Sequence, residues 1–155
     1  MPDQTRKLAA IVFTDIVGYT KLAADDQSKA SALLKQQRNL FQPIVSRFNG
    51  SWIKEVGDGL ILTFDTVTDA VNCCIKLQET SKQIDDLDLR IGIHQGEILM
   101  EENDVIGDDV NIGARIEPHS PIGGIAISEK VKLEIGSLPE YQTQFIGEPK
   151  LKGIS

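Results

Sequence analysis

Residues 8–15 read LAAIVFTD, an unbroken apolar run that is followed by a threonine and an aspartate. Six consecutive apolar residues of this kind predict a central strand that is buried on both faces of a sheet. Asp15 therefore comes at the end of the most apolar strand in the chain. Aspartate favours turns, so a solvated turn is the simpler interpretation, but the position after a buried strand weakens it.

The segments that follow predict two helices and three strands. Apolar residues recur at helical spacing over residues 30–48, where Pro43 predicts a kink or a new segment, and again over residues 69–83. Residues 51–55 and 60–64 flank a Gly-Asp-Gly sequence, which predicts a hairpin with Asp58 at its tip. Residues 87–100 predict a long strand, with Gly92 and Gly96 as expected bends.

The C-terminal third predicts shorter elements. These are a helix over residues 107–116, a strand over residues 125–127, a helix over residues 129–135 capped by Ser128, and a last strand over residues 141–146. The order of elements is typical of an α+β, ferredoxin-like (palm-type) domain. We expect a mostly antiparallel sheet with helices on one face, plus a small C-terminal helix and strand appendix.

Composition limits the possible partners and compartments. The 155 residues are 41% hydrophobic and 25% charged with a net charge of −7, which predicts one globular domain over residues 1–155. No basic run is present, so we expect no nucleic-acid partner. The longest apolar run is too short to cross a bilayer and no signal peptide is evident, so we expect no membrane contact by this domain. Adjacent Cys73 and Cys74 fit a reduced, cytoplasmic compartment.

Two pairs of polar residues have the chemistry of a phosphate or metal site. Sequential strands usually lie side by side, so Asp15 and Asp58 are expected at one edge of the sheet, where two carboxylates suit Mg²⁺. Asn111 and Arg115 are four residues apart, so a helix presents both on one face, where they suit an oxyanion. A pair of turn aspartates and a solvated polar helix face are the simpler alternatives. His94 has no metal-ligand spacing and is expected to pack at the core or its rim.

Taken together, four ordered segments resemble the catalytic domain of class III adenylyl/guanylyl cyclases of the bacterial type. The resemblance extends over residues 7–153. The segments are residues 13–20 (FTDIVGYT), 54–59 (KEVGDG), 90–96 (RIGIHQG) and 104–115 (DVIGDDVNIGAR). A Gly-Gly-Asp/Glu-Glu-Phe hairpin, which a diguanylate cyclase would show, is not found at residues 57–60.

The resemblance implies a role for each polar residue in these segments. Asp15, the backbone carbonyl of Ile16 and Asp58 match ligands of two Mg²⁺ ions, for which Mn²⁺ is expected to substitute. Lys54 and Asp104 match the pair that recognises the purine, and in this family lysine with aspartate selects adenine.

The remaining matches concern the ribose and the phosphates. Asn111 matches the residue that orients the ribose, and Arg115 matches the one that stabilises the transition state. Arg90 matches a triphosphate-binding arginine, and Lys152 is the candidate for the terminal phosphate-binding lysine.

The implied activity is the conversion of ATP to 3′,5′-cyclic AMP and pyrophosphate, by in-line attack of the ribose 3′-oxygen on the α-phosphate. Similar cyclases act as head-to-tail homodimers in which both protomers contribute to each site. A guanylate-specific cyclase and a non-catalytic nucleotide-sensing or dimerisation module are the alternatives. Residues 151–155 stop in mid-pattern, so we expect an unknown fused regulatory module, and the longer protein could be membrane-anchored.

Overall fold

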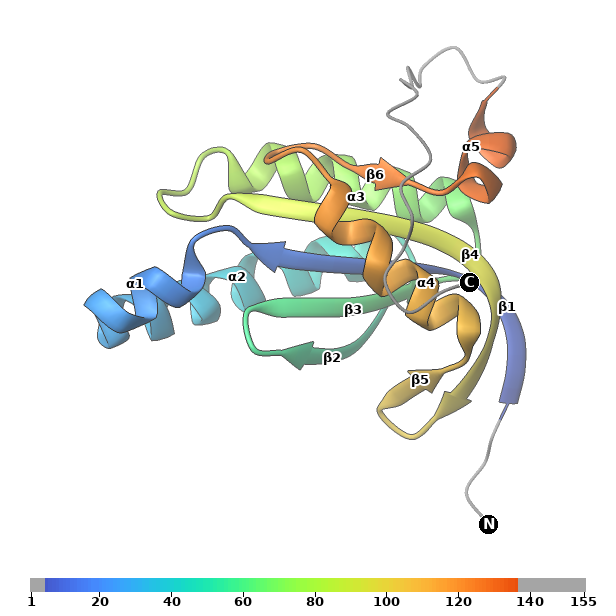
Figure 1. Cartoon of the computed structure of the whole chain (residues 1–155), viewed down its shortest axis with the longest axis horizontal. Helices are drawn as coiled ribbons and strands as arrows, with labels where there is room; N and C mark the ends of the chain where they lie inside the picture. Colours follow the sequence, from blue (N-terminus) through green and yellow to red (C-terminus); the bar gives the residue numbers. More distant parts are fainter. Residues whose placement is uncertain (1–4, 137–155) are drawn as a thin grey trace.

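Six strands form one sheet in the computed structural model, which describes residues 5–136 (Figure 1). The order along the sheet is β2 (Ser51–Val56), β3 (Gly59–Phe64), β1 (Thr5–Ile16), β4 (Leu89–Glu101) and β5 (Asp104–Ile106). Neighbours along this path pair antiparallel, and β6 (Ala126–Ile127) pairs parallel with β4. The mostly antiparallel α+β fold predicted from the element order is confirmed.

The central strand β1 divides its apolar residues between two cores, as a strand buried on both faces must. Ala10 and Val12 lie in the larger core, whereas Ala9 and Ile11 face the smaller one. β1 pairs with β3 on one side and with the whole length of β4 on the other. The end of β1 that carries Asp15 is therefore held from both sides.

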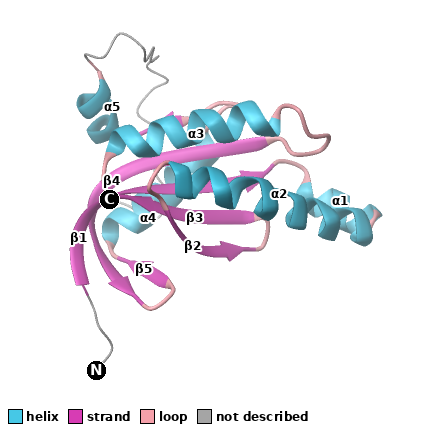
Figure 2. Cartoon of the chain, turned by 180° about the vertical axis from the view of Figure 1, so that it is seen from behind, coloured by secondary structure: helices cyan, strands magenta, loops and turns pink. Residues whose placement is uncertain are grey.

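Helices cover both faces of the sheet, which departs from the expectation of a single covered face. α2 (Gln27–Arg47) and α3 (Val67–Ser81) pack on the larger core, and Figure 2 shows them in front of the sheet. α4 (Asp108–Ile116) lies on the opposite face, where Val110 joins the smaller core. The reason is that the odd-numbered residues of β1 are as apolar as the even-numbered ones and need a cover of their own.

Pro43 does not begin a new segment, because α2 continues through it to Arg47. Phe41, Ile44 and Val45 are buried in one core on both sides of the proline, and this packing holds the helix together despite the missing hydrogen bond. The Asp26 side chain accepts from the backbone N–H of Lys29 at 3.1 Å and starts the helix. The preceding α1 (Tyr19–Asp25) was not predicted.

The smaller elements follow the predicted order. Ser128 begins α5 (Glu129–Ile135), and η1 (Glu117–His119) follows α4 directly. β5 and the turn at Asn103, which has a φ of 59°, were not predicted. The strand predicted over residues 141–146 lies outside the described residues. Among the helices of residues 5–136, none has the length and apolarity needed to cross a membrane.

Candidate active site

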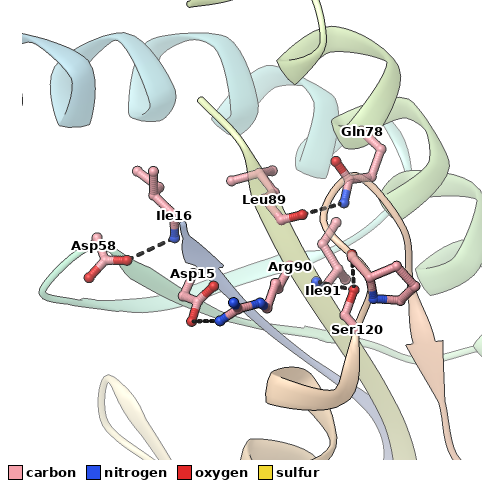
Figure 3. A network of polar contacts seen from close by, with 9 residues as sticks. Asp15, Ile16, Asp58, Gln78, Leu89, Arg90, Ile91 and Ser120 are labelled. Atoms are coloured by element: carbon pink, nitrogen blue, oxygen red, sulfur yellow. Dashed lines mark hydrogen bonds and ion pairs between the residues drawn. The ribbon is translucent and has the colours of Figure 1, made fainter. Parts of the chain in front are cut away.

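The β2–β3 hairpin carries Asp58 to the end of β1, as the sequence predicted. Gly57 adopts a φ of 61°, and a Cβ on Gly59 would lie 2.7 Å from the carbonyl oxygen of Thr14, so glycine is needed at both positions. The Asp58 Oδ2 atom accepts a hydrogen bond of 2.8 Å from the backbone N–H of Ile16 (Figure 3). The two aspartates therefore share one edge of the sheet.

Asp15 faces Arg90 across the β1–β4 register. The Arg90 Nη1 atom lies 4.0 Å from the Asp15 Oδ2 atom, and both side chains are about one-third exposed. The Asp15 Oδ1 atom is buried and has no hydrogen-bond partner. An unpaired buried carboxylate oxygen is unfavourable, and a bound cation would remove the penalty, so this edge fits a metal ion.

Polar side chains fix the backbone of β4 on both sides of Arg90. The Gln78 Nε2 atom donates to the carbonyl oxygen of Leu89 at 3.0 Å, and the Ser120 Oγ atom accepts from the N–H of Ile91 at 3.2 Å (Figure 3). Both side chains are buried, so these bonds are shielded from water. Arg90 is thus placed by a rigid main chain.

Glu117 is a third acidic group at this edge, which the sequence interpretation missed. It is buried, and its pKa is raised to about 8, first by burial and then by the neighbouring Asp15 carboxylate. A Cβ on Gly92 would lie 2.5 Å from the backbone nitrogen of Glu117, so glycine at this position permits the close contact of the two elements. Within residues 5–136, no group of three or more His, Cys, Asp or Glu side chains is arranged to hold a metal ion by itself.

Lys54 and Asp104 meet although their strands, β2 and β5, lie at the two ends of the strand order in the sheet. The Lys54 Nζ atom lies 3.0 Å from the Asp104 Oδ1 atom, and each side chain is 38% exposed. The hydrogen bond from Lys54, followed by that from the Val105 N–H, holds the pKa of Asp104 below its usual value. The structure therefore pairs the donor and the acceptor that the resemblance assigned to the purine.

Arg38 supports this pair from the adjacent helix. Its guanidinium donates to both carboxylate oxygens of Glu55, at 2.6 and 2.9 Å, and lowers the pKa of that carboxyl. Because Glu55 follows Lys54 in β2, the bidentate contact ties this strand to α2. Sequence reasoning did not find Arg38, since its partner is distant along the chain.

α4 presents Asn111 and Arg115 as the spacing predicted. The Arg115 Nη1 atom donates to the carbonyl oxygen of Asn111 at 3.2 Å, and Asn111 is exposed. Within residues 5–136, neither side chain forms a hydrogen bond or ion pair with Asp15 or Asp58. One chain thus holds two separate groups of candidate residues. Lys152 lies outside the described residues.

Comparisons with known proteins identify the family. The family model for the "Adenylate and Guanylate cyclase catalytic domain" matches residues 1–155. The chain belongs to this family. The cyclase domain is 36% identical over 134 residues to "Putative adenylate cyclase 3" of Rhizobium meliloti (strain 1021), covering 81% of this chain and 23% of that protein. It is 25% identical over 120 residues to "Adenylate cyclase" of Streptomyces coelicolor, covering 76% of this chain and 32% of the relative.

Solved structures agree with this assignment. The "Adenylate/Guanylate Cyclase/Hydrolase" of Silicibacter pomeroyi superposes with a TM-score of 0.90 at 30% identity, over 99% of this cyclase domain and 94% of that chain. The guanylate cyclase domain of RhGC from Catenaria anguillulae, solved with GTP, shares the fold with a TM-score of 0.86 at 22% identity, over 96% and 92% of the two chains. The cyclase domain spans less than a third of the length of the curated relatives described above.

Proposed function

We propose that this cyclase domain converts ATP to 3′,5′-cyclic AMP and pyrophosphate. The observation that carries the proposal is the 3.0 Å contact between Lys54 and Asp104. Adenine offers an acceptor at N1 and a donor at its 6-amino group, and a lysine with an aspartate complements both. Guanine has the opposite pattern, with a donor at N1 and an acceptor at O6. A lysine and aspartate pair that matches adenine therefore leaves polar groups unpaired when guanine is bound. Two relatives named as adenylate cyclases support adenine.

Two Mg²⁺ ions are proposed to be held by Asp15, Asp58 and the carbonyl of Ile16, with Mn²⁺ as a substitute. The unpaired Asp15 Oδ1 atom supports this assignment. When bound, the ions would supply Lewis-acid activation of the ribose 3′-oxygen and neutralise charge on the phosphates. Phosphoryl-type transfer of this kind depends on positioning and electrostatic stabilisation, so the chain needs no covalent nucleophile.

The cationic and amide side chains have complementary tasks in this mechanism. Arg90, fixed by the main chain of β4, binds the triphosphate, and Lys152 is proposed as a further phosphate ligand. Asn111 orients the ribose through its amide, and Arg115 donates to the α-phosphate oxygens as charge develops there.

We propose that each site is shared across a head-to-tail homodimer. One protomer supplies Asp15, Asp58 and Arg90. Its partner supplies the purine and transition-state groups, which are Lys54, Asp104, Asn111 and Arg115. The lack of contact between the α4 residues and the two aspartates within one chain supports a shared site, and a symmetric dimer then holds two complete sites.

The test is product identity. Purified chain at high, matched concentration is incubated with ATP or GTP and either Mg²⁺ or Mn²⁺, and the nucleotides are separated chromatographically. We expect cyclic AMP from ATP and at least about tenfold less cyclic GTP from GTP. A preference for GTP would identify a guanylate cyclase, and saturable ATP binding without any turnover would support the nucleotide-sensing alternative.

The proposal extends to the setting of the domain. The relatives are several times longer than the matched region, which supports a catalytic domain fused to a regulatory module of unknown signal. A cytoplasmic location of this domain remains our prediction.

A further inference from the structure

His94 is a buried polar residue that the proposed mechanism does not use. It lies in β4, is 5% exposed, and joins three elements of the fold. Its Nε2 atom lies 2.9 Å from the Oδ1 atom of Asp109 in the first turn of α4. Its Nδ1 atom lies 2.8 Å from the Oγ atom of Ser128, which begins α5. The sequence predicted a packed histidine and a capping serine but no link between them.

The partners determine the direction of each hydrogen bond. The Asp109 carboxylate accepts, so the Nε2 atom of His94 carries the hydrogen. The Nδ1 atom then accepts from the hydroxyl of Ser128, whose Oγ atom in turn accepts from the N–H of Val131 at 3.5 Å. Both ring nitrogens are paired, and the Ser128 hydroxyl both donates and accepts, so the imidazole links α4 to α5 without leaving either of its nitrogens unpaired.

Two glycines let α4 approach the sheet closely enough for this contact. A Cβ on Gly96 of β4 would collide with the Asp109 carboxylate. A Cβ on Gly113 of α4 would lie 3.0 Å from the Phe13 ring and 3.6 Å from the Cβ of His94. α4 therefore packs directly against the His94 side chain.

α4 is held by apolar packing on the smaller core and by the polar contact from His94. Its N-cap, Gly107, makes no side-chain capping bond, and Val110 and Gly113 are the buried residues of the helix. A helix this short gains most of its stability from tertiary contacts. The bond from His94 to Asp109 adds a buried, directional contact to this packing and ties the first turn of α4 to β4.

We propose that His94 is a positioning residue for the reaction: through Asp109 it holds α4 so that Asn111 and Arg115 meet the substrate. The inference rests on the proposed function, because those two side chains act on the ribose and the α-phosphate. Misplacement of catalytic groups by about 1 Å costs on the order of 100-fold in rate. Purine recognition uses Lys54 and Asp104 outside α4, so the loss is expected in kcat and not in KM.

Two conservative substitutions separate the two bonds of His94. In His94→Gln the side-chain amide reaches the position of the Nε2 atom and keeps a donor for Asp109. In His94→Asn the shorter amide stands near the Nδ1 atom and keeps only the contact with Ser128. Both variants lose one buried hydrogen bond, so similar decreases in melting temperature are expected. We expect His94→Asn to lose about 100-fold in kcat with KM for ATP within about threefold, and His94→Gln to stay within about fivefold of wild type.

A neighbouring aspartate supplies the matched control. Asp108 is in the same first turn of α4 but is exposed, so Asp108→Ala removes the same charge from the helix without touching His94. Asp109→Ala is expected to lower kcat as His94→Asn does, whereas Asp108→Ala is expected to leave it within about twofold of wild type. Equal kcat losses in His94→Gln and His94→Asn would overturn the proposal, since general loosening of the core would explain them.

Hydrogen exchange of the α4 amides provides a readout that needs no activity. If His94 holds α4 through Asp109, the amides of residues 108–116 should exchange about tenfold faster or more in His94→Asn and Asp109→Ala than in His94→Gln and Asp108→Ala. Unchanged exchange in all four variants would overturn the proposal. If the wild-type chain makes no cyclic nucleotide, the proposed function is wrong. The hydrogen-exchange comparison of the four variants then tests on its own whether His94 holds α4 in position.

Discussion

The carboxylate edge and the recognition surface of this cyclase domain are built in different ways. We define the carboxylate edge as Asp15, Asp58, Arg90 and Glu117, and the recognition surface as Lys54, Asp104, Asn111 and Arg115. At the edge, the Ile16 N–H holds Asp58, buried Gln78 and Ser120 hold the main chain on both sides of Arg90, and Glu117 is buried. On the recognition surface, Lys54 contacts Asp104 and Arg115 donates to the main-chain carbonyl of Asn111, both at or near the solvent. Under the proposed function, a single chain would present a nearly complete metal edge, and its recognition groups would require a partner protomer to exclude water.

The largest expected effect comes from the carboxylate edge. Asp15→Asn or Asp58→Asn removes a metal-binding charge while keeping the shape of the side chain, so turnover is expected to fall by about 10³-fold or more. Asp65→Asn is the matched control, because Asp65 is an exposed aspartate paired with Lys7 at the far end of β3. Near-wild-type turnover in either edge variant, measured with Mg²⁺ and with Mn²⁺, would remove the metal assignment.

Mixing two inactive variants tests whether the two regions come from different protomers. Asp58→Ala and Arg115→Ala homodimers each lack one group in both sites. In the heterodimer one site carries both changes and the other carries none. Random pairing makes half of the dimers mixed, so activity is expected to recover to about a quarter of wild type. The variants are compared at high, matched concentration because weak association lowers recovery.

Independent labelling of the two chains provides the control for the mixing experiment. A mixture that stays inactive although the labels show subunit exchange would place both groups in the same protomer's site, and the proposed assignment of the two regions would be wrong.

We predict that base selection depends on Lys54 and Asp104 of the recognition surface. The double substitution Lys54→Glu with Asp104→Cys replaces the donor at position 54 by an acceptor and weakens the acceptor at position 104. We therefore expect kcat/KM for ATP to fall by about 100-fold. The same change is expected to raise the ratio of GTP to ATP turnover, measured in competition. Unchanged preference would mean that the 3.0 Å contact between Lys54 and Asp104 is a structural ion pair only.

The smallest expected effect concerns stability and the pH dependence of the carboxylate edge. The folded state raises the pKa of Glu117 from 4.5 to about 8, so folding favours the protonated acid. This stabilisation is complete below about pH 4.5 and is lost as the pH rises through about 8, where the buried group must ionise. Glu117→Gln keeps a neutral side chain, so its free energy of unfolding should exceed that of wild type by about 2–4 kcal/mol at pH 9 and by less at pH 5.

Chemical denaturation in metal-free buffer measures this difference between wild type and Glu117→Gln. Added Mg²⁺ is expected to reduce it, since a cation near Asp15 and Glu117 favours the ionised acid. A difference that does not change between pH 5 and pH 9 would show that Glu117 does not titrate in this range.

Sequence reasoning succeeded where short-range patterns carry the information. The run at residues 8–13, the Gly-Asp-Gly tip and the i, i+4 spacing of Asn111 and Arg115 each involve neighbours along the chain, and each expected placement is found. Of the two outcomes predicted at Pro43, a new segment is wrong, because α2 continues through the proline with buried residues on both sides of it. Glu117 was missed for a similar reason, since its burial depends on a glycine at position 92 in a different element.

The sequence by itself determined the α+β class, the strand that ends at Asp15, the hairpin that carries Asp58, and the family. The first three depend on periodicity and turn chemistry, which act over a few residues, whereas the family follows from the resemblance of four ordered segments. Only the tertiary structure decided that α4 covers the second face of the sheet, that Lys54 meets Asp104, and that His94 joins Asp109 to Ser128. Such contacts form only when the helices pack on the assembled sheet, because they join residues that are distant along the chain. The same packing buries Glu117 beside Asp15 and thereby raises its pKa.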